Sequence, residues 1–401
     1  MFRKGGLDCR MTTDCRMLAN LDSEAGGSMK FLGSNEREGH SRTPLTAVVL
    51  VNLGTPDAPT AAALRRYLGE FLSDPRVVET PRWLWWLILH GVILRIRPAR
   101  SARAYATVWT EQGSPLLVGS QALADAVQTE LGARLGTDAP VVRLAMSYGN
   151  PKLRDVLEDL RSRGMRRLLV VPLYPQYSGS TTASVFDAVS SQLQRWRWIP
   201  DLRFVTEYYR EPGYVQALAA SVREHWEAQG RGERLLLSFH GIPGRYLVNG
   251  DPYYCQCQVT ARLLRESLGL GESELHVTFQ SRVGREPWLQ PYTDQTLVEW
   301  ARSGVRRVDV MCPGFSIDCL ETLEEIAGQN AEAFVHAGGE RLSYIPALNH
   351  RPDHVATIAQ LVVQQMGGWL PPSADAADRE ARLVRAAAVH AGQDWLKGVQ
   401  R

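Results

Sequence analysis

Two apolar segments lie far apart in the chain and end in the same Gly-x-Pro turn. Residues 45–56 read LTAVVLVNLGTP, and residues 235–243 read LLLSFHGIP. A short apolar run that leads into glycine and proline is typical of a buried strand followed by a loop. The same element therefore occurs once in each half of the chain, and this repetition constrains the fold more than any other feature.

A second pair of segments repeats in the same order. Residues 164–172, GMRRLLVVP, resemble residues 304–313, GVRRVDVMCP. Each is followed by a turn, a helical pattern and a further strand candidate, at 202–208 in one half and at 341–345 in the other. Two more strand candidates lie between these landmarks, at 141–146 and 275–279.

Strands that alternate with amphipathic segments and recur as a set predict an α/β fold. We expect two similar doubly wound, Rossmann-like halves, each with a parallel sheet, and a crevice between them. The predicted halves cover residues 44–212 and 233–368. The first half is longer because residues 57–140 carry an insertion.

The two ends of the chain differ from the halves. Residues 1–43 are polar, rich in Gly and Ser, contain four methionines and lack the apolar region of a signal peptide. We therefore expect a disordered tail or a start assigned too early, with Met29 as the alternative start. Residues 370–401 are rich in Ala and Arg and predict a trailing helix.

Composition excludes several classes of function. The chain has 401 residues, of which 44% are hydrophobic and 22% charged, and its net charge of +2 gives no nucleic-acid footprint. No stretch reaches the roughly 18 apolar residues of a spanning helix. Six cysteines in a chain of this length predict thiols in a reducing cytosol rather than a disulfide framework. We therefore expect a cytoplasmic protein.

One apolar segment stands apart, Trp83–Leu94, which reads WLWWLILHGVIL. A buried core helix is one interpretation. The other is an amphipathic lip that touches the inner face of the membrane or holds a large apolar ligand, because tryptophan beside arginine marks interfacial helices. Arginines can also bind ligand carboxylates with two hydrogen bonds. Those that flank the segment are Arg82, Arg95, Arg97, Arg100 and Arg103.

Chemistry-bearing residues follow the predicted strands of the second half. His240 lies where the apolar run of residues 235–243 passes into its Gly-x-Pro loop, and Asp318 and Glu321 follow the 304–313 segment. In an open parallel sheet, ligands bind outside the carboxyl ends of the strands, so these residues are expected to face one crevice. An imidazole opposite carboxylates suits divalent-metal binding or proton removal.

Each of these residues also has a structural alternative. His240 could be a hydrogen-bonded histidine without a chemical role. Asp318 and Glu321 fit a capping box, with Asp318 as the N-cap and Glu321 at the third helical position. The functional and structural interpretations of the carboxylates can coexist, because Asp318, Glu321 and Glu325 share one helical face.

Cofactor motifs are weak in this chain. Four cysteines, Cys255, Cys257, Cys312 and Cys319, could in principle hold an iron–sulfur cluster. Their C-x-C and C-x6-C spacings are poor matches to cluster and zinc motifs, so plain thiols are expected. The chain lacks G-x-G-x-x-G and the P-loop lysine motif, which gives little support to nucleotide binding.

Considered as a set, the motifs of residues 45–365 resemble the ferrochelatase family. The resemblance does not extend to the N-terminal tail or to the end of the chain. It runs in order through VNLGTPDAP (51–59), FLSDPRVV (71–78), GSPL (113–116), SYGNP (147–151), PLYPQYS (172–178), SFHGIP (238–243), GDPY (250–253), FQSR (279–282), WLQP (288–291) and CPGFSIDCLETLEE (312–325).

The resemblance implies a lyase that inserts Fe²⁺ into protoporphyrin IX, removes two pyrrole protons and uses no ATP. The product is protohaem, formed in the terminal step of haem biosynthesis. His240 matches the family's active-site histidine, which is a proton acceptor and proposed iron ligand. Glu321 matches the carboxylate across the ring, which is the other metal ligand, and Asp318 matches a member of the associated acidic relay. No cofactor beyond the substrate iron is implied, because the C-terminal cysteine cluster of animal members has no counterpart.

The resemblance also assigns porphyrin contacts. Leu53 stands where coproporphyrin-using members place a tyrosine, so an aliphatic residue there favours protoporphyrin. Ser147 replaces an arginine of animal members, so that Arg97 or Arg100 near the lip is expected to meet the ring carboxylates. The other expected ring contacts are Tyr148, Gly241, Ile242, Pro243 and Phe315.

Two other functions remain as alternatives. A related chelatase would insert another metal or use another tetrapyrrole. A non-enzymatic porphyrin carrier would keep its affinity for the ring when His240 or Glu321 is replaced. The oligomeric state is not indicated by the sequence.

Overall fold

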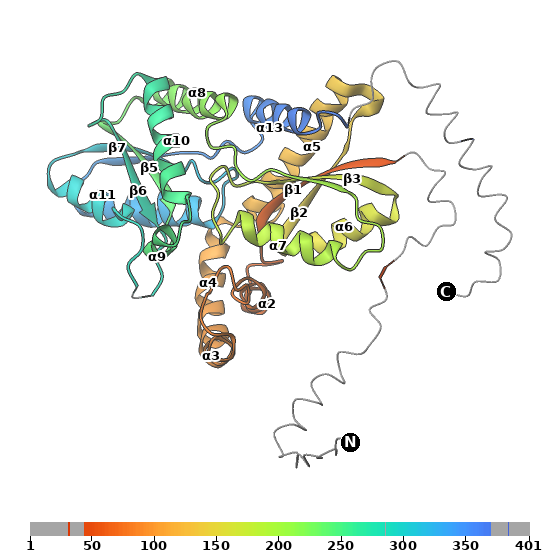
Figure 1. Cartoon of the computed structure of the whole chain (residues 1–401). Coiled ribbons are helices and arrows are strands. Elements are labelled where there is room, and N and C mark those ends of the chain that lie inside the picture. Colours follow the sequence, from red (N-terminus) through yellow and green to blue (C-terminus); the bar gives the residue numbers. More distant parts are fainter. Residues whose placement is uncertain (1–30, 33–43, 285, 370–383, 385–401) are drawn as a thin grey trace, which may run out of the picture.

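The computed structural model describes residues 31–32, 44–284, 286–369 and 384. Within these residues the strands form two four-stranded sheets in which every neighbouring pair is parallel (Figure 1). The strands of the first sheet are β1 (Leu45–Thr55), β2 (Val141–Gly149), β3 (Met165–Pro172) and β4 (Asp201–Phe204). Those of the second are β5 (Arg234–His240), β6 (Leu275–Gln280), β7 (Arg307–Met311) and β8 (Arg341–Ile345).

The two sheets have the same strand order. The first is ordered β2-β1-β3-β4 and the second β6-β5-β7-β8, so the first strand of each half lies second in its sheet. The repeated apolar segments form β1 and β5, and the repeated Gly-x-Arg-Arg segments lead into β3 and β7. The predicted fold class, two similar doubly wound parallel halves, is confirmed.

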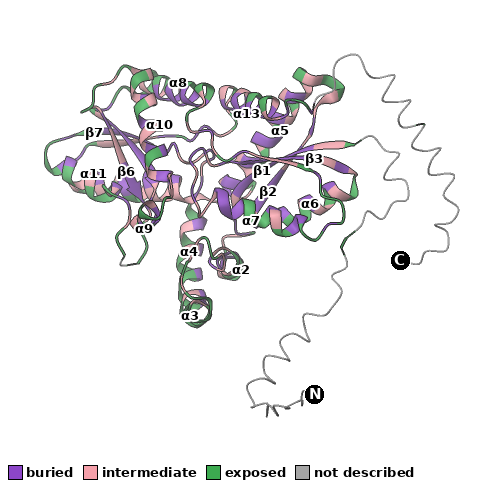
Figure 2. Ribbon diagram, in the orientation of Figure 1, coloured by how far each residue is buried: buried purple, intermediate pink, exposed green. Residues whose placement is uncertain are grey.

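Helices cover both faces of each sheet, which explains why the central strands are apolar without alternation. Residues 47–51 of β1 are fully buried, and the strands are the most buried part of Figure 2. The helices of the first half are α2 (Ala61–Phe71), α3 (Arg82–Ile88), η1 (Leu89–Ile93), α4 (Leu94–Val108), α5 (Pro115–Leu135), η2 (Gly136–Asp138), α6 (Leu153–Ser162), α7 (Thr182–Leu193) and α8 (Pro212–Gln229). Those of the second are α9 (Gly244–Val248), α10 (Tyr253–Leu268), α11 (Thr293–Arg302), η3 (Glu321–Asn330), α12 (Ala331–His336) and α13 (Pro352–Gln365).

The last helix of each half crosses over to the other half. α8 packs against α10, and α13 packs against α5 and α8. Beyond α13, the indole Nε1 of Trp369 donates to Asp201 Oδ2 at 2.6 Å, beside the edge strand β4. One hydrophobic cluster contains residues of both sheets, among them Val48 and Phe239. The ranges 44–212 and 233–368 therefore describe the two sheets, whereas the core is shared.

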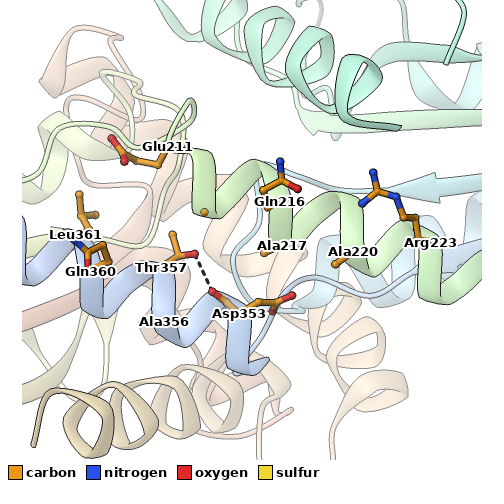
Figure 3. A pocket seen from close by; sticks show the side chains of 11 residues that line it. Glu211, Gln216, Ala217, Ala220, Arg223, Asp353, Ala356, Thr357, Gln360 and Leu361 are labelled. Atoms are coloured by element: carbon orange, nitrogen blue, oxygen red, sulfur yellow. Dashed lines mark hydrogen bonds between the residues drawn. The ribbon is translucent and has the colours of Figure 1, made fainter. Parts of the chain in front are cut away.

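The longer connection of the first half forms a projecting arm. α5 leads into β2 as α10 leads into β6, so the additional elements between residues 57 and 140 are α2, α3, η1 and α4. Figure 1 shows α2, α3 and α4 on the side of the sheets opposite α8 and α13. A groove of about 470 Å³ runs between α8 and α13 on that far side (Figure 3). No helix among the described residues is long and apolar enough to span a membrane.

The two predicted terminal segments fall almost entirely outside the described residues. Of residues 1–43, only 31 and 32 are described, and Leu32 forms an isolated parallel bridge with Trp196. Of residues 370–401, only residue 384 is described. The predicted tail and trailing helix therefore remain predictions.

Candidate active site

His240 is the last residue of β5 and lies beside Gln280, the last residue of β6, in the sheet register. Its imidazole is half-buried, and its Nδ1 lies 2.6 Å from the carbonyl oxygen of Gly241. A carbonyl can only accept, so Nδ1 carries the proton and Nε2 keeps its lone pair. This tautomer leaves Nε2 available as a proton acceptor or a metal ligand.

The turn after His240 is held against the 288–289 segment. A Cβ atom added to Gly241 would lie 3.1 Å from the ring of Trp288, so the indole packs closely against this glycine. Ile242 is buried, and its carbonyl accepts from Leu289 N at 3.0 Å. Pro243 forms an isolated bridge with Trp288. The three predicted ring-contact positions 241–243 therefore form one constrained turn.

The second element that holds candidate site residues is a π-helix, η3. η3 begins at Glu321, and its N-cap residue is Leu320, which makes no side-chain capping hydrogen bond. The predicted capping box is therefore wrong. The hydroxyl of Thr322 donates to Asp318 Oδ1 at 3.0 Å, so the aspartate bonds a side chain instead of a helix-terminal backbone N–H. π-Helical turns are rare and occur frequently at functional sites.

Asp318 is surrounded by hydrogen-bond donors. Besides Thr322, its Oδ1 accepts from the hydroxyl of Tyr344 at 2.6 Å and from the backbone of Ala347 at 3.3 Å. Its Oδ2 accepts from Asn349 Nδ2 at 2.8 Å, and Asn349 Oδ1 accepts from Asp318 N at 3.0 Å. These contacts tie the start of η3 to the segment after β8, so Asp318 positions the π-helix.

Glu321 lies beside two phenols of the projecting arm. Burial raises the pKa of Tyr67 on α2 and of Tyr105 on α4, and the negative charge of Glu321 raises both further. The hydroxyl of Tyr67 donates to the carbonyl of Gly54 at 3.0 Å. Because both phenols stay neutral, the arm contributes uncharged hydroxyl groups near Glu321, and the neighbouring charge is that of Glu325 on η3. The arm therefore forms part of the wall around this carboxylate.

Glu325 follows Glu321 by four residues on η3 and lies close to His240. Its Oε1 accepts from Ser281 N at 2.9 Å and its Oε2 accepts from the hydroxyl of Ser281. Burial raises the pKa of Glu325, while the Ser281 hydrogen bonds and the positive form of His240 oppose that rise. A carboxyl group with a raised pKa beside an imidazole is suited to receive a proton from it.

Apolar residues from both halves meet at the site. Leu53 at the end of β1 and Leu320 before η3 pack against the cluster that contains Tyr148. The hydroxyl of Tyr148 is engaged inside the protein, where it donates to Asp74 Oδ2 at 2.7 Å, so only its ring is available to a ligand. The ring centroid of Phe315 lies 6.4 Å from that of His240. Leu53 and Tyr148 of the first half thus share one apolar cluster with Leu320 beside η3, while Phe315 lies beside His240.

The arm presents its apolar residues to the outside. α3 has no buried residue, and Trp83 and Trp86 are 71% and 59% exposed. The core-helix interpretation holds only for Leu89 and Leu94, which are buried in a hydrophobic cluster, and the lip interpretation agrees with the exposure of the two tryptophans. Arg97 is exposed on α4, and among the described residues no hydrogen bond or ion pair joins it to His240 or Glu321. Its role toward ring carboxylates remains a prediction.

The described cysteines are free thiols. Cys257, Cys312 and Cys319 are buried and Cys255 is exposed. Burial raises the pKa of each buried thiol well above its usual value. Within the residues that the structure describes, no group of three or more His, Cys, Asp or Glu side chains is arranged to hold a metal ion.

Comparison with known proteins places the chain in a family. The model of the ferrochelatase family matches residues 45–366. The chain belongs to the ferrochelatase family. The ferrochelatase of Thioalkalivibrio sulfidiphilus is 55% identical over 369 residues, which cover 91% of this chain and 99% of the relative. That of Nitrosococcus oceani is 55% identical over 341 residues, which cover 85% and 92%. The solved structure of SirB from Bacillus subtilis with Fe³⁺ covers 81% of this chain and 98% of its own, at 11% identity and a TM-score of 0.48, too distant to bear on activity.

Several residues around this ferrochelatase site were not predicted. Gln280 and Ser281 lie within the FQSR motif, but their contacts with η3 depend on the pairing of β5 with β6. Tyr67 and Tyr105 belong to the insertion and carry no motif. Asp74 lies in the FLSDPRVV motif, and its hydrogen bonds from the hydroxyls of Tyr148 and Ser184 indicate its role in the structure.

Proposed function

We propose that this member of the ferrochelatase family inserts Fe²⁺ into protoporphyrin IX to form protohaem, as a metal chelatase of the lyase class that needs no ATP. One observation carries the proposal. The Nδ1–H of His240 is committed to the Gly241 carbonyl, so Nε2 is left basic beside the carboxylates of η3. Membership of the family supports the reaction itself.

Metal insertion requires that two pyrrole N–H protons leave the ring. His240 Nε2 is the proposed acceptor, because the hydrogen bond of Nδ1–H to the Gly241 carbonyl leaves the lone pair on Nε2. Glu325 is the proposed next recipient, since burial raises its pKa and it lies near His240. His240 and Glu321 are the proposed iron ligands, an imidazole and a carboxylate that Fe²⁺ accepts. We propose no iron–sulfur cluster, because the C-x-C and C-x6-C spacings of Cys255, Cys257, Cys312 and Cys319 are poor matches to cluster motifs.

The ring is proposed to lie against residues contributed by both halves. Leu53 is aliphatic and packs against the Tyr148 cluster, which supports protoporphyrin IX over a ring with more carboxylates. Phe315 and the 241–243 turn are the proposed contacts on the side of His240, and Arg97 is proposed to meet the ring carboxylates.

The reaction is tested with purified protein, Fe²⁺ and protoporphyrin IX under anaerobic conditions, by following the loss of porphyrin fluorescence. We expect haem formation by the wild type and its loss in His240→Ala. His336→Ala is the control, because His336 is exposed at the end of α12 and its Nδ1 bonds the carbonyl of Glu332 on the same helix. Activity with coproporphyrin III alone would overturn the ring assignment. Porphyrin binding without insertion of any metal would favour a carrier.

We further propose that the lip touches the membrane surface, as a peripheral contact of a cytoplasmic enzyme. Exposed Trp83, Trp86 and Leu87 lie on one short helix that arginines follow on α4, a pattern suited to anionic lipid. Co-sedimentation with vesicles that contain anionic lipid is expected for the wild type and not for Trp83→Ala/Trp86→Ala. Trp198→Ala, an exposed tryptophan between α7 and β4, is the control that should still bind.

A further inference from the structure

Gln280 lies between β5 and η3, the two elements that hold His240 and the carboxylates. It ends β6 beside His240, and its side chain is almost fully buried, with the residue 4% exposed. Its Nε2 donates to the backbone carbonyl of Glu321 at 2.8 Å and lies 3.4 Å from Glu325 Oε2. One amide group therefore joins the strand of the histidine to the helix of the carboxylates.

The other end of the same amide is also occupied. Its Oε1 accepts from the hydroxyl of Ser238 at 2.7 Å, two residues before His240 on β5, and lies 3.5 Å from Cys312 Sγ. A primary amide has two donor hydrogens and two acceptor lone pairs, and all four have partners here. Because the group is buried and fully bonded, it holds one orientation.

The partners lie on different elements. Ser238 belongs to β5, Cys312 follows β7, and Glu321 and Glu325 belong to η3. The backbone oxygen of Gln280 adds a further tie, since it accepts from Gly241 N at 2.8 Å. A change in the amide would therefore shift η3 relative to the strand that ends in His240.

We propose that Gln280 is a positioning residue that sets the spacing between His240 and Glu321, and thereby the affinity of the enzyme for ferrous ion. The inference rests on the proposed function and deepens it. Gln280 is too deeply buried to contact a porphyrin, so its replacement is expected to change the affinity for the metal and not the affinity for the ring. Partners that orient metal ligands typically contribute about 10- to 100-fold to metal affinity when they are removed.

The experiment separates the two substrates. Gln280→Glu keeps the acceptor toward Ser238 but places a carboxylate opposite the Glu321 carbonyl and Glu325. We expect the KM for Fe²⁺ to rise about 10- to 100-fold, while the KM for protoporphyrin IX changes less than about twofold. Binding of Co²⁺ to the protein without porphyrin, followed by its visible absorption, is expected to weaken to the same extent.

A matched control is Gln256→Glu. Gln256 is another buried amide whose Nε2 donates to a glutamate, Glu207, while its Oε1 accepts from Tyr177 N at 2.7 Å. It should lose stability without a selective rise in the metal KM. Gln280→Met, which adds no charge and removes all four contacts, serves if Gln280→Glu does not fold.

The outcomes are distinct. Equal rises in both KM values, or a loss of stability alone as in Gln256→Glu, would overturn the positioning role. A wild type that inserts no metal would overturn the proposed function instead, and the Co²⁺ titration would still decide whether Gln280 governs metal binding.

Discussion

The two halves of the molecule share one strand order but differ in the connection that follows the third strand. After β3 the chain enters α7, a regular α-helix with no acidic residue in its first turn. After β7 the corresponding connection enters η3, a π-helix whose first turn carries Glu321 and Glu324. The carboxylates proposed to take part in the reaction therefore belong to the half whose helix departs from regular geometry.

The strand ends show the same contrast. β1 ends at Leu53-Gly54-Thr55, whereas the equivalent turn after β5 begins with His240. The first half supplies apolar surface, since the hydroxyl of Tyr148 is engaged by Asp74. Repetition of the fold thus provides two equivalent sheet edges, and their local residues give the first edge a proposed role in ring binding and the second a proposed role in the reaction.

The largest expected difference concerns the two equivalent glycines. Gly54 has a φ of +109°, and a Cβ there would lie 1.7 Å from the carbonyl oxygen of Tyr148. At Gly241 the nearest atom, the carbonyl oxygen of Gln280, would lie at 2.8 Å. We expect Gly54→Ala to lower the free energy of unfolding by about 3–5 kcal/mol and Gly241→Ala by about 1–3 kcal/mol. Urea unfolding measures both, and equal losses would contradict the contrast.

Loss of the acidic group at the start of η3 comes next. Glu321→Gln removes a proposed iron ligand but keeps the size of the side chain. We expect kcat/KM to fall about 10²- to 10³-fold, with the unfolding midpoint nearly unchanged. Glu324→Gln on the same helix is the control, because Glu324 only accepts from Gln329 Nε2 at 2.7 Å. If both variants lose activity equally, the loss comes from the reduced negative charge of the helix and not from a missing iron ligand at position 321.

Sequence reasoning predicted the strands, the repeat and the position of His240 at a strand end, because apolar runs and the Gly-x-Pro turn are local signals. It could not find the π-helix, whose wider bonding depends on distant partners. The carbonyl of Glu321 accepts from Gln280 Nε2 at 2.8 Å, 41 residues earlier in the chain. The capping-box prediction failed for a similar reason, because the Asp318 oxygens bond Tyr344 and Asn349, which follow much later in the chain.

The helices α8 and α13, which pack against each other between the two halves, are expected to differ in how their stability depends on pH. α8 and α13 both begin with proline, and the third residue is Tyr214 in one and His354 in the other. Burial lowers the pKa of His354 from 6.5 to about 4, and its Nδ1–H donates to the carbonyl of Asn349 at 2.6 Å. Burial raises the pKa of Tyr214, so it does not titrate in acid.

Between these two pKa values of His354, the unfolded chain binds a proton that the folded chain does not. Its contribution to stability is therefore complete above pH 6.5 and is lost as the pH falls to about 4. The loss is on the order of 3 kcal/mol. His354→Asn keeps a donor for the Asn349 carbonyl and should flatten this part of the stability profile, as measured by urea unfolding from pH 7 to 4. An unchanged slope would mean that other groups cause it.

The smallest expected effect separates positioning from proton relay at Asp318. Asp318→Asn preserves one acceptor oxygen but turns an amide toward the donating Nδ2 of Asn349. We expect a loss of about 2 kcal/mol in the free energy of unfolding, because one hydrogen bond to a charged group becomes a clash of two donors. A positioning residue predicts a modest decrease in kcat/KM, roughly tenfold or less, that follows the stability loss. A relay residue predicts the opposite, a fall in activity as large as in Glu321→Gln with an unchanged unfolding midpoint. The occupied oxygens of Asp318 favour the first outcome, since a carboxylate that already accepts from Tyr344, Thr322 and Asn349 has little capacity left to receive a proton.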